Sequence, residues 1–264
     1  MNVIVCVKQV PATNEIKIDN ETKTIIREGM EAIINPFDMY AVEEALRIKE
    51  KSDGKVTVIS MGIPSVAEIL KKMIALGADE AILLSDKAFA GADSLATAYT
   101  LSLGIEKIGA YDLVICGNQA IDGDTAQVGP SLAEKLGIPH TTCVRRIEEI
   151  SKGRLSCQRL TEDGFDIVEM QLPALLTVVK EINEPRNPTL KGMKRAKETV
   201  IKVWNAEDLE ADKDLCGLKG SATQVVNTFI PEHDYGCEII NGTLEEQVKR
   251  LADRVLPLCF DECK

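Results

Sequence analysis

Apolar and polar residues alternate along the first half of the chain in blocks that are typical of strands and helices in turn. Short continuous apolar runs indicate strands that are covered on both faces. Segments with apolar residues three or four positions apart indicate helices with one buried stripe. The expected strands are 3–7, 56–61, 81–84 and 113–116, and the expected helices include 92–108 and 125–136. This alternation predicts an α/β fold with a doubly wound, mostly parallel sheet and right-handed crossovers.

Two further helices are marked by residues that are typical of helix ends. Asn35 precedes Pro36, which is the order of an N-cap residue and a proline at the first helical position. Ser65 and Glu68 have the spacing of a capping box, and Gly77 is expected to end the helix that they begin.

The pattern changes after Pro139. Three strand-like runs at 143–150, 154–160 and 167–171 are joined by short turns, which predicts an antiparallel meander. One more apolar strand is expected at 174–179. We expect this group to extend the parallel sheet rather than to form a separate domain.

The chain between 183 and 197 is irregular and basic. Residues 184–190 include two prolines, so we expect neither a helix nor a central strand there. Four basic residues follow in an otherwise acidic protein, namely Lys191, Lys194, Arg195 and Lys197. We expect one α/β domain over 1–200, which includes the loop 183–197, and a C-terminal extension over 201–264.

A separate helix is expected near the C-terminus. Leu244, Val248, Leu251 and Val255 are spaced to lie on one helical face. Because this helix lies beyond the expected core, its apolar face must be buried elsewhere, and we expect a partner protein to cover it. The sequence therefore predicts a C-terminal helical arm.

Composition narrows the classes of function. The net charge of −11 argues against nucleic acid as a partner, because the phosphate backbone would repel the protein. No run approaches the roughly 20 apolar residues that span a bilayer, so no membrane insertion is expected. The N-terminus enters an apolar run without a basic region or cleavage site, which predicts a cytoplasmic protein.

The eight cysteines do not have the spacing of a disulfide framework or a metal site. Cys6, Cys116 and Cys143 lie in apolar strand-like runs, where a reduced cysteine acts as a small apolar residue. No Cys-x-x-Cys pair occurs, and Cys259 and Cys263 are too few for a zinc or iron–sulfur site. We expect no catalytic side chain and no metal, so any redox chemistry must come from a bound organic cofactor.

Ligands of a parallel sheet bind beyond the carboxyl ends of its strands. This rule directs attention to four loops, which follow Val7, include 35–38, follow Met61 and follow Cys116. The last of these loops is the most informative, because it connects a buried strand to a helix.

The loop 117–127 has features of an anion-binding site. Gly117 and Gly123 permit a positive φ or a close backbone approach to a ligand. The first N–H groups of the helix, expected near 125–127, favour an anion. We expect Asp124 to be the N-cap and Asp122 to accept hydrogen bonds from ribose hydroxyls. On the residues alone, a capped helix start in a tight turn explains the loop equally well.

Several motifs together resemble a known family. They are 5–11 (Val-Cys-Val-Lys-Gln-Val-Pro), 35–38 (Asn-Pro-Phe-Asp) with 41–45, 117–129, 162–164 leading to 172–177, and 183–186 (Asn-Glu-Pro-Arg). Over 3–203 the sequence resembles the electron-transfer flavoprotein β-subunit family. The resemblance implies a fold similar to the adenine-nucleotide α-hydrolases, and a C-terminal extension that packs on an α-subunit.

The resemblance also implies a nucleotide site in the four loops. The residues implied are Cys6, Asn35, Pro36, Phe37, Asp38, Met61, Gly117, Asn118, Gln119, Ala120, Ile121, Asp122, Gly123, Asp124, Thr125, Ala126, Gln127 and Val128. We add Lys8 as a further expected contact, and its role and that of Asn118 stay open.

Two branches of the family differ in the ligand of this site. The ordinary branch holds AMP, whereas the flavin-based bifurcating branch holds a second FAD with NADH docking nearby. The stretch 122–130 is similar to the bifurcating branch. Its small residues Gly123, Thr125 and Ala126 would leave room for a pyrophosphate and an isoalloxazine.

The resemblance thus implies the β-subunit of a bifurcating complex. NADH would deliver a hydride to FAD, and electrons would pass to ferredoxin or flavodoxin and, through the α-subunit FAD, to a flavin-dependent dehydrogenase of acyl-CoA or 2-hydroxyacid type. One alternative is a subunit that holds AMP as a structural ligand, in a flavoprotein that carries electrons from dehydrogenases to a quinone oxidoreductase. Another is a nucleotide-sensing domain with the same fold.

The family also uses the stretch after Glu-Pro-Arg to recognise dehydrogenases. In this sequence that stretch is 187–197, with Leu190 at the position of the anchoring leucine. The implied partner-binding residues are Leu190, Lys191, Met193 and Lys194. A solvated surface loop is the alternative for this segment.

Overall fold

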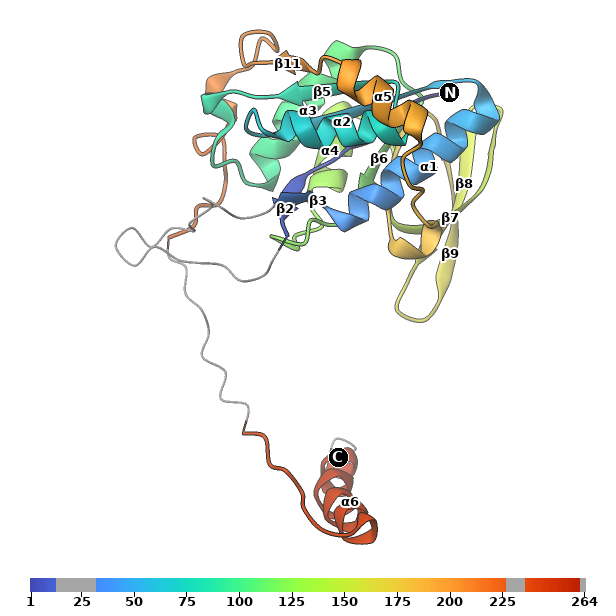
Figure 1. Ribbon diagram of the computed structural model, residues 1–264, viewed down its shortest axis with the longest axis vertical. Helices are drawn as coiled ribbons and strands as arrows, with labels where there is room; N and C mark the ends of the chain where they lie inside the picture. Colours follow the sequence, from blue (N-terminus) through green and yellow to red (C-terminus); the bar gives the residue numbers. More distant parts are fainter. Residues whose placement is uncertain (13–31, 227–235, 262–264) are drawn as a thin grey trace. The chain divides into compact units, whose positions relative to one another are not determined.

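The computed structural model describes residues 1–12, 32–226 and 236–261 of the 264. The chain divides into two compact units, Met1–Val226 and Asn227–Lys264. The first unit is an α/β domain, and the second contains one helix (Figure 1).

A nine-stranded sheet forms the centre of the first unit. Its order is β11-β5-β4-β1-β6-β10-β7-β8-β9, and the pairs from β11 to β7 are all parallel. The strands are β1 (Asn2–Cys6), β4 (Lys55–Met61), β5 (Glu80–Leu84), β6 (Leu113–Gly117), β7 (His140–Ser151), β8 (Arg154–Leu160), β9 (Phe165–Gln171), β10 (Ala174–Val178) and β11 (Lys202–Trp204). The strands β7, β8 and β9 pair antiparallel, which confirms the predicted meander and its place in the same sheet.

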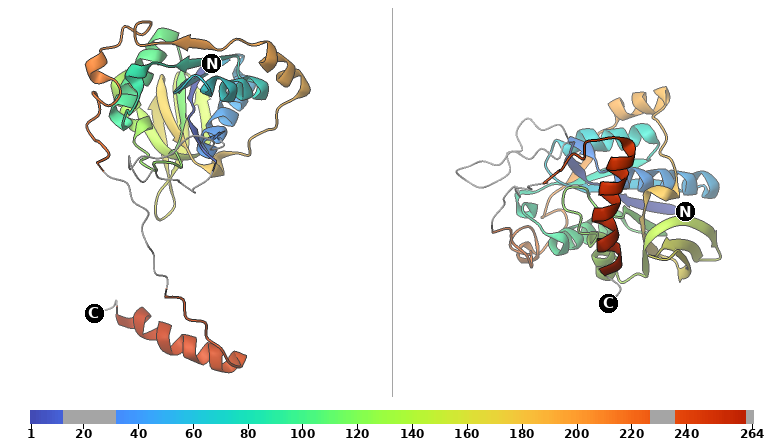
Figure 2. Two further views of the ribbon diagram at one scale, coloured as in Figure 1. Left: turned by 60° about the vertical axis from the view of Figure 1, so that its left-hand side comes forward. Right: turned by 90° about the horizontal axis from the view of Figure 1, so that it is seen from below.

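Helices cover both faces of this sheet (Figure 2). The helices of the first unit are α1 (Pro36–Ser52), α2 (Val66–Leu76), α3 (Ser94–Ile108), α4 (Val128–Leu136) and α5 (Leu190–Glu198), with single turns η1 (Lys87–Phe89), η2 (Lys180–Ile182) and η3 (Lys213–Leu215). The helices α1 and α2 share one apolar core with Val3 and Val5, and α3 and α4 share the other with Ile4. Successive residues of β1 therefore point into opposite cores, which explains its continuous apolar run.

A small hairpin lies beside the main sheet. β2 (Gln9–Pro11) pairs antiparallel with β3 (Ala32–Ile34). β2 follows β1 closely, and β3 leads into α1, so the hairpin brings the end of β1 next to the start of α1.

The predicted start and cap of one helix are wrong, and the predicted capping bond of another is absent. The helix α4 begins at Val128 rather than at 125, and its N-cap is Gln127 rather than Asp124. Asp124 is left-handed, with a φ of 48°, and its carboxylate accepts a hydrogen bond from Gln119 within the loop, so it does not cap the helix. The helix α2 begins at Val66 with Ser65 at the N-cap, as predicted, but Ser65 makes no capping hydrogen bond, because Glu68 N donates to Ser65 O instead.

The basic segment is a helix rather than a loop over most of its length. Irregular chain continues only to Thr189, and α5 begins at Leu190. The hydroxyl of Thr189 accepts a hydrogen bond from Gly192 N at 3.0 Å, which caps the new helix. Pro185 and Pro188 thus exclude helix before Thr189 but not after it.

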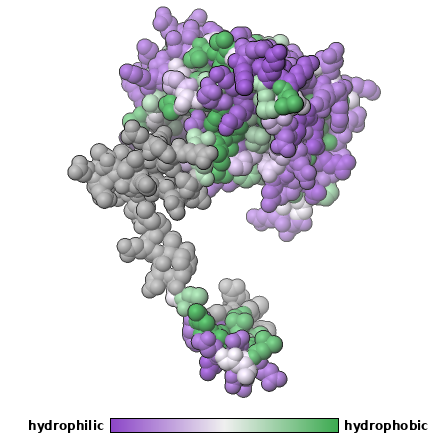
Figure 3. All heavy atoms as spheres, in the orientation of Figure 1, coloured by the Kyte–Doolittle hydropathy of each residue, from purple (hydrophilic) through white to green (hydrophobic). Residues whose placement is uncertain are grey.

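The second unit contains α6 (Leu244–Asp261), which confirms the predicted C-terminal helix. Thr243 and Glu246 form a reciprocal capping box, with Thr243 N donating to Glu246 Oε2 at 2.9 Å and Glu246 N donating to Thr243 Oγ1. The apolar residues Leu244, Val248, Leu251 and Val255 are exposed. Figure 3 shows this apolar surface along the helix.

Candidate functional site

Three of the four loops expected from the sequence are joined at the carboxyl edge of the sheet. The chain after β1, the start of α1 and the loop after β6 are joined by hydrogen bonds through Asn35 and Asp38. Sequence position alone did not indicate these bonds, because the partners lie up to 86 residues apart.

Asp38 is a buried carboxylate, 5% exposed, in the first turn of α1. Its two oxygens accept hydrogen bonds from Lys8 N at 2.7 Å and from Asn35 Nδ2 at 2.8 Å. Burial raises the pKa of Asp38 to about 7, although hydrogen bonds from Asn35, Lys8 N and the Gly117 backbone oppose this shift. Asp38 thus ties the ends of β1 and β6 to α1.

Asn35 occupies the N-cap position of α1, as predicted, but its side chain does not cap the helix. Its Nδ2 also donates to Gln119 O at 2.8 Å, and its Oδ1 accepts from Ile121 N at 3.2 Å. One amide side chain therefore satisfies an acceptor and a donor of the loop after β6, and fixes the path of that loop.

The loop itself is closed by local bonds. Ala120 O accepts hydrogen bonds from the backbone N–H groups of Gly123 and Asp124. Gln119 Nε2 donates to Asp124 Oδ1 at 2.8 Å. Asp124 and Ala126 adopt left-handed backbone conformations, with φ of 48° and 52°. A compact, strained turn therefore stands between β6 and α4.

Lys8 and Asp122 form an ion pair across this loop. The Lys8 ammonium lies 2.6 Å from Asp122 Oδ1, and the two side chains are 50% and 32% exposed. The expected role of Asp122 as an acceptor for ribose hydroxyls stays a prediction. In this structure its carboxylate neutralises Lys8, the one lysine or arginine among the expected cofactor contacts.

The two glycines of the loop act by their lack of a side chain, not by a positive φ. Neither Gly117 nor Gly123 has a positive φ. A Cβ on Gly117 would lie 2.3 Å from Asp38 Oδ1, so Gly117 allows a close approach of β6 to α1. A Cβ on Gly123 would meet nothing within 4 Å, so this residue borders open space.

Two cysteines lie beneath the loops. Cys6 and Cys116 are directly opposed in β1 and β6, and both are buried. A hydrogen bond with the Cys6 side chain, together with burial, raises the pKa of Cys116 well above its usual range. Cys116 is therefore a neutral thiol in the floor of the site. Met61 ends β4 at the same edge and is partly exposed.

A polar cluster that the sequence did not reveal supports Asn118. Thr177 Oγ1 donates to Asn118 Oδ1 at 3.2 Å, and the Cys143 thiol donates to the same oxygen at 3.3 Å. Cys143 is left-handed, with a φ of 57°, and lies where the register of β7 against β10 shifts. The apolar character of these strands gave no signal for this cluster, which forms only when β6, β7 and β10 pair.

The second helix at this edge is α3. Ser94, its first residue, donates from Oγ to Gln127 Oε1 at 2.9 Å. Asp93 caps α3 by accepting from Leu95 N and Ala96 N. Sequence analysis did not select Ser94, and only the close packing of α3 and α4 places it beside the loop.

The expected partner-binding residues lie on α5 rather than in the carboxyl-edge loops. Leu190 is 83% exposed, and Met193 is exposed one turn later. Lys191 and Lys194 are exposed next to them. The structure thus presents two apolar side chains among lysines on one short helix.

No group of three or more histidine, cysteine, aspartate or glutamate residues in the described ranges could hold a metal ion. None of the described helices is long and apolar enough to cross a membrane. Cys263 and the side chain of Cys259 lie outside the described part of the chain.

Polar loops gathered at the carboxyl ends of a doubly wound sheet are the usual ligand site of α/β proteins. Comparison with known proteins shows the family to which the chain belongs. A family model described as the electron transfer flavoprotein domain matches residues 22–209. The electron transfer flavoprotein subunit beta of Thermoanaerobacterium thermosaccharolyticum is 54% identical over 257 residues, which cover 97% of this chain and 98% of the relative.

Two other relatives carry different names. Subunit CarD of the caffeyl-CoA reductase–Etf complex of Acetobacterium woodii is 49% identical, covering 94% of this chain and 95% of its own. Protein FixA of Azotobacter vinelandii is 42% identical, covering 99% and 95%. The chain belongs to the electron-transfer flavoprotein family, as a β-subunit, and such a subunit has an α-subunit as its partner.

Proposed function

We propose that this β-subunit holds FAD at its carboxyl-edge loops and belongs to an NADH-dependent, electron-bifurcating flavoprotein. The bound flavin would supply the electron chemistry, dividing the electrons of NADH between ferredoxin or flavodoxin and, through the α-subunit FAD, a partner dehydrogenase of acyl-CoA or 2-hydroxyacid type. The similarity to subunit CarD of a reductase–Etf complex supports the proposal that the β-subunit works together with a partner enzyme.

The observation that carries the proposal is the open space at Gly123. Gly123 is exposed, a Cβ added there would meet no protein atom within 4 Å, and the neighbouring residues Thr125 and Ala126 are small. A large planar cofactor can lie on this face of the loop, because no bulky side chain stands there to block it.

The polar groups of the site fit an anionic nucleotide that is held mainly by neutral donors. Lys8 is already paired with Asp122, so its charge is partly neutralised. The hydroxyl of Ser94 and the backbone N–H groups at the start of α4 lie at the same edge. Under this proposal these groups bind the pyrophosphate, while Asn35 and Asp38 keep the loop in place.

The remaining parts of the proposal concern partners. Leu190, Met193 and the adjacent lysines would contact the dehydrogenase, with Leu190 entering an apolar pocket. The apolar face of α6 would be covered by the α-subunit. Replacing Leu190 by alanine should weaken coupling to the dehydrogenase while flavin content stays constant.

Counting flavins in the purified α/β complex tests the proposal. Two FAD per heterodimer, together with flavin bleaching on addition of NADH, is the expected result. One FAD and one AMP per heterodimer would overturn it in favour of a β-subunit that holds AMP.

A matched pair of variants locates the second flavin. Gly123→Val should fold normally but lose one FAD, because the new side chain fills the space at the loop. Gly164→Val is the control, since its Cβ also meets nothing within 4 Å but lies in the turn between β8 and β9. Equal flavin content in the two variants would contradict the placement of FAD beside Gly123.

A further inference from the structure

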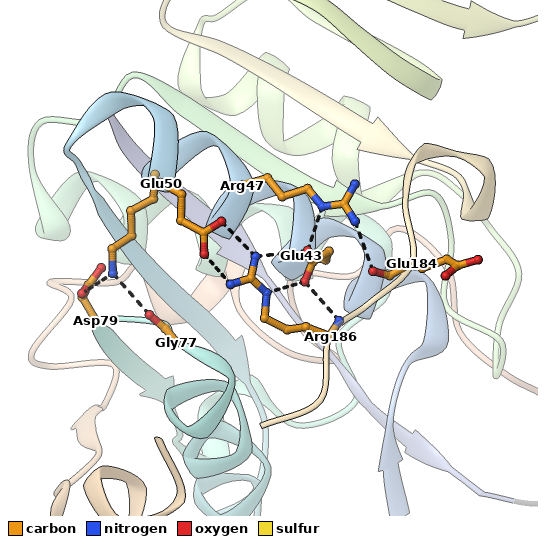
Figure 4. A network of polar contacts seen from close by, with 8 residues as sticks. Glu43, Arg47, Glu50, Gly77, Asp79, Glu184 and Arg186 are labelled. Atoms are coloured by element: carbon orange, nitrogen blue, oxygen red, sulfur yellow. Dashed lines mark hydrogen bonds and ion pairs between the residues drawn. The ribbon is translucent and has the colours of Figure 1, made fainter. Parts of the chain in front are cut away.

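The segment that leads into α5 is held to α1 by a network of charged groups. Figure 4 shows Arg186 lying between Glu43 and Glu50, two carboxylates on the same side of α1. Arg47, also on α1, donates from Nε to Glu43 Oε1 at 2.8 Å and from Nη2 to Glu184 O at 3.3 Å. The network therefore holds the chain to α1 at Glu184 and Arg186, shortly before Leu190.

Glu43 is the centre of this network. It is 4% exposed, and its Oε2 accepts hydrogen bonds from both Arg186 N at 3.1 Å and Arg186 Nε at 2.8 Å. Burial alone would raise the pKa of Glu43, but the hydrogen bonds from Arg186 and Arg47 outweigh it and hold that pKa below its usual value. One carboxylate thus fixes both the backbone and the side chain of Arg186.

Further anchors lie on either side of the network. Asn183 Nδ2 donates to Tyr40 O at 3.0 Å, which holds the beginning of the segment to α1. Beyond Leu190, Arg195 donates from Nη2 to Ile74 O at 2.8 Å and also to Ala78 O, at the end of α2. Figure 1 shows α5 beside α2.

The backbone of α5 also contacts α2 directly. A Cβ on Gly192 would lie 2.0 Å from Ala75 O, so only glycine permits this approach. Leu190 therefore projects from a short stretch that is fixed to the body of the domain before and after it. A side chain held in this way loses little conformational entropy when a partner binds it.

We propose that Arg186, bound to Glu43 and Glu50, is a positioning residue for dehydrogenase docking, because it fixes the segment from which Leu190 enters the partner. The inference rests on the proposed role of Leu190. The lysines at 191, 194 and 197 surround that leucine, so the matching surface of the dehydrogenase is an apolar pocket with an acidic rim.

A network that only stabilised the domain would affect folding and leave docking unchanged, and a steady-state assay separates the two roles. The assay uses the intact α/β complex with an acyl-CoA dehydrogenase, and measures rate against the concentration of the complex. Arg186→Gln should raise KM for the complex about tenfold with kcat nearly unchanged, because only uniform binding is lost. Arg186→Lys, which keeps the charge, should restore part of the affinity.

Two other variants distinguish a loss of positioning from unfolding or a general loss of stability. Glu50→Gln weakens the hold on Arg186 from the exposed side and leaves Glu43 paired, so it should raise KM in the same direction. Lys49→Gln is the matched control, because Lys49 lies next to Glu50 on α1 but pairs with Asp79, which follows α2, and makes no ion pair with the segment 183–189. Its KM should equal that of the unmodified complex.

Leu190→Ala distinguishes failure of this inference from failure of the proposed function. If Leu190→Ala raises KM while Arg186→Gln and Glu50→Gln do not exceed Lys49→Gln, the positioning role is overturned and the docking role of Leu190 stands. If Leu190→Ala also leaves KM unchanged with acyl-CoA and 2-hydroxyacid dehydrogenases, both are overturned.

Discussion

Asn35 donates its side-chain amide to the buried carboxylate of Asp38 at 2.8 Å, and the same amide nitrogen donates to the loop after β6. The carboxylate orients the amide, and the amide in turn orients the loop. Because Asp38 also accepts from Lys8 N, three segments that are distant in sequence meet at this pair. A change at either residue should therefore affect the candidate site more than the rest of the fold.

Replacing Asn35 by alanine tests this relationship. The change leaves Gln119 O and Ile121 N without their partner, which should lower the free energy of unfolding by about 1–3 kcal/mol. Nucleotide content of the purified complex should fall as well. Urea unfolding and nucleotide analysis measure the two effects. Asn2→Ala, at the exposed first position of β1, is the control and should change stability by less than about 0.5 kcal/mol. Similar losses in both variants would refute the role of Asn35.

Asp38 should make stability depend on pH in the acidic to neutral range. Its pKa is about 7 in the folded protein against 3.8 for an unperturbed aspartate. Between these values the folded state keeps a proton that the unfolded state has lost, so the free energy of unfolding decreases as the pH rises. The slope from this group is at most about 1.4 kcal/mol per pH unit, and it ends above pH 7.

Asp38→Asn should remove that slope. The measurement is urea unfolding of both proteins from pH 4 to pH 8, and the difference between the two curves isolates the carboxyl group. Glu43 and Glu50 contribute stability that is present above pH 4.5 and is lost as the pH falls through their lowered pKa values, and this loss is common to both proteins, so it cancels in the difference. Parallel curves for the two proteins across this range would show that Asp38 is ionised throughout.

The Lys8–Asp122 pair should contribute little to stability. Both side chains are substantially exposed, so solvent screens the attraction and the coupling energy should be about 0.2–1 kcal/mol. A double-mutant cycle with Lys8→Met and Asp122→Asn measures this energy, and it should shrink in high salt. The exposed pair of Lys71 and Glu68 on α2 serves as a reference. A coupling above about 2 kcal/mol would mean that the pair is far better shielded than its exposure indicates.

The strands and most helices of the α/β domain could be predicted because their signals are local. The apolar runs of β1, β4 and β6 need no knowledge of their partners to be recognised. The helix α5 was not predicted, because the docking of Gly192 and Arg195 on α2 stabilises it and two preceding prolines obscured it. The three-residue strand β11 was also missed, since so short a strand is defined only by its backbone pairing with β5.

In the candidate site, too, local features could be predicted and features that depend on distant contacts could not. The parallel strands β4, β1 and β6 are neighbours, so the loops that follow them lie at one edge of the sheet, and ligand binding at that edge stays a prediction. The rule that ligands bind at that edge could not predict the role of Asp124, whose carboxylate accepts a hydrogen bond from Gln119 instead of capping α4. The contacts of Thr177 and Cys143 with Asn118 were not predicted either. Each is an ordinary strand residue in the sequence, and only the pairing of β10 and β7 places it beside Asn118.

The apolar face of α6 predicts how the second unit is used. If the α-subunit covers this face, as proposed, then a carboxylate at Val248 must be buried against it or must separate the two chains. Val248→Asp should therefore weaken association of α and β at least tenfold, which corresponds to about 1.4 kcal/mol. Lys249→Asp is the matched control, because it introduces the same side chain one position away and off the apolar stripe. Sedimentation of the co-expressed complex over a dilution series measures the dissociation. If both variants dissociate at the same concentration as the unmodified complex, the α-subunit does not cover this face.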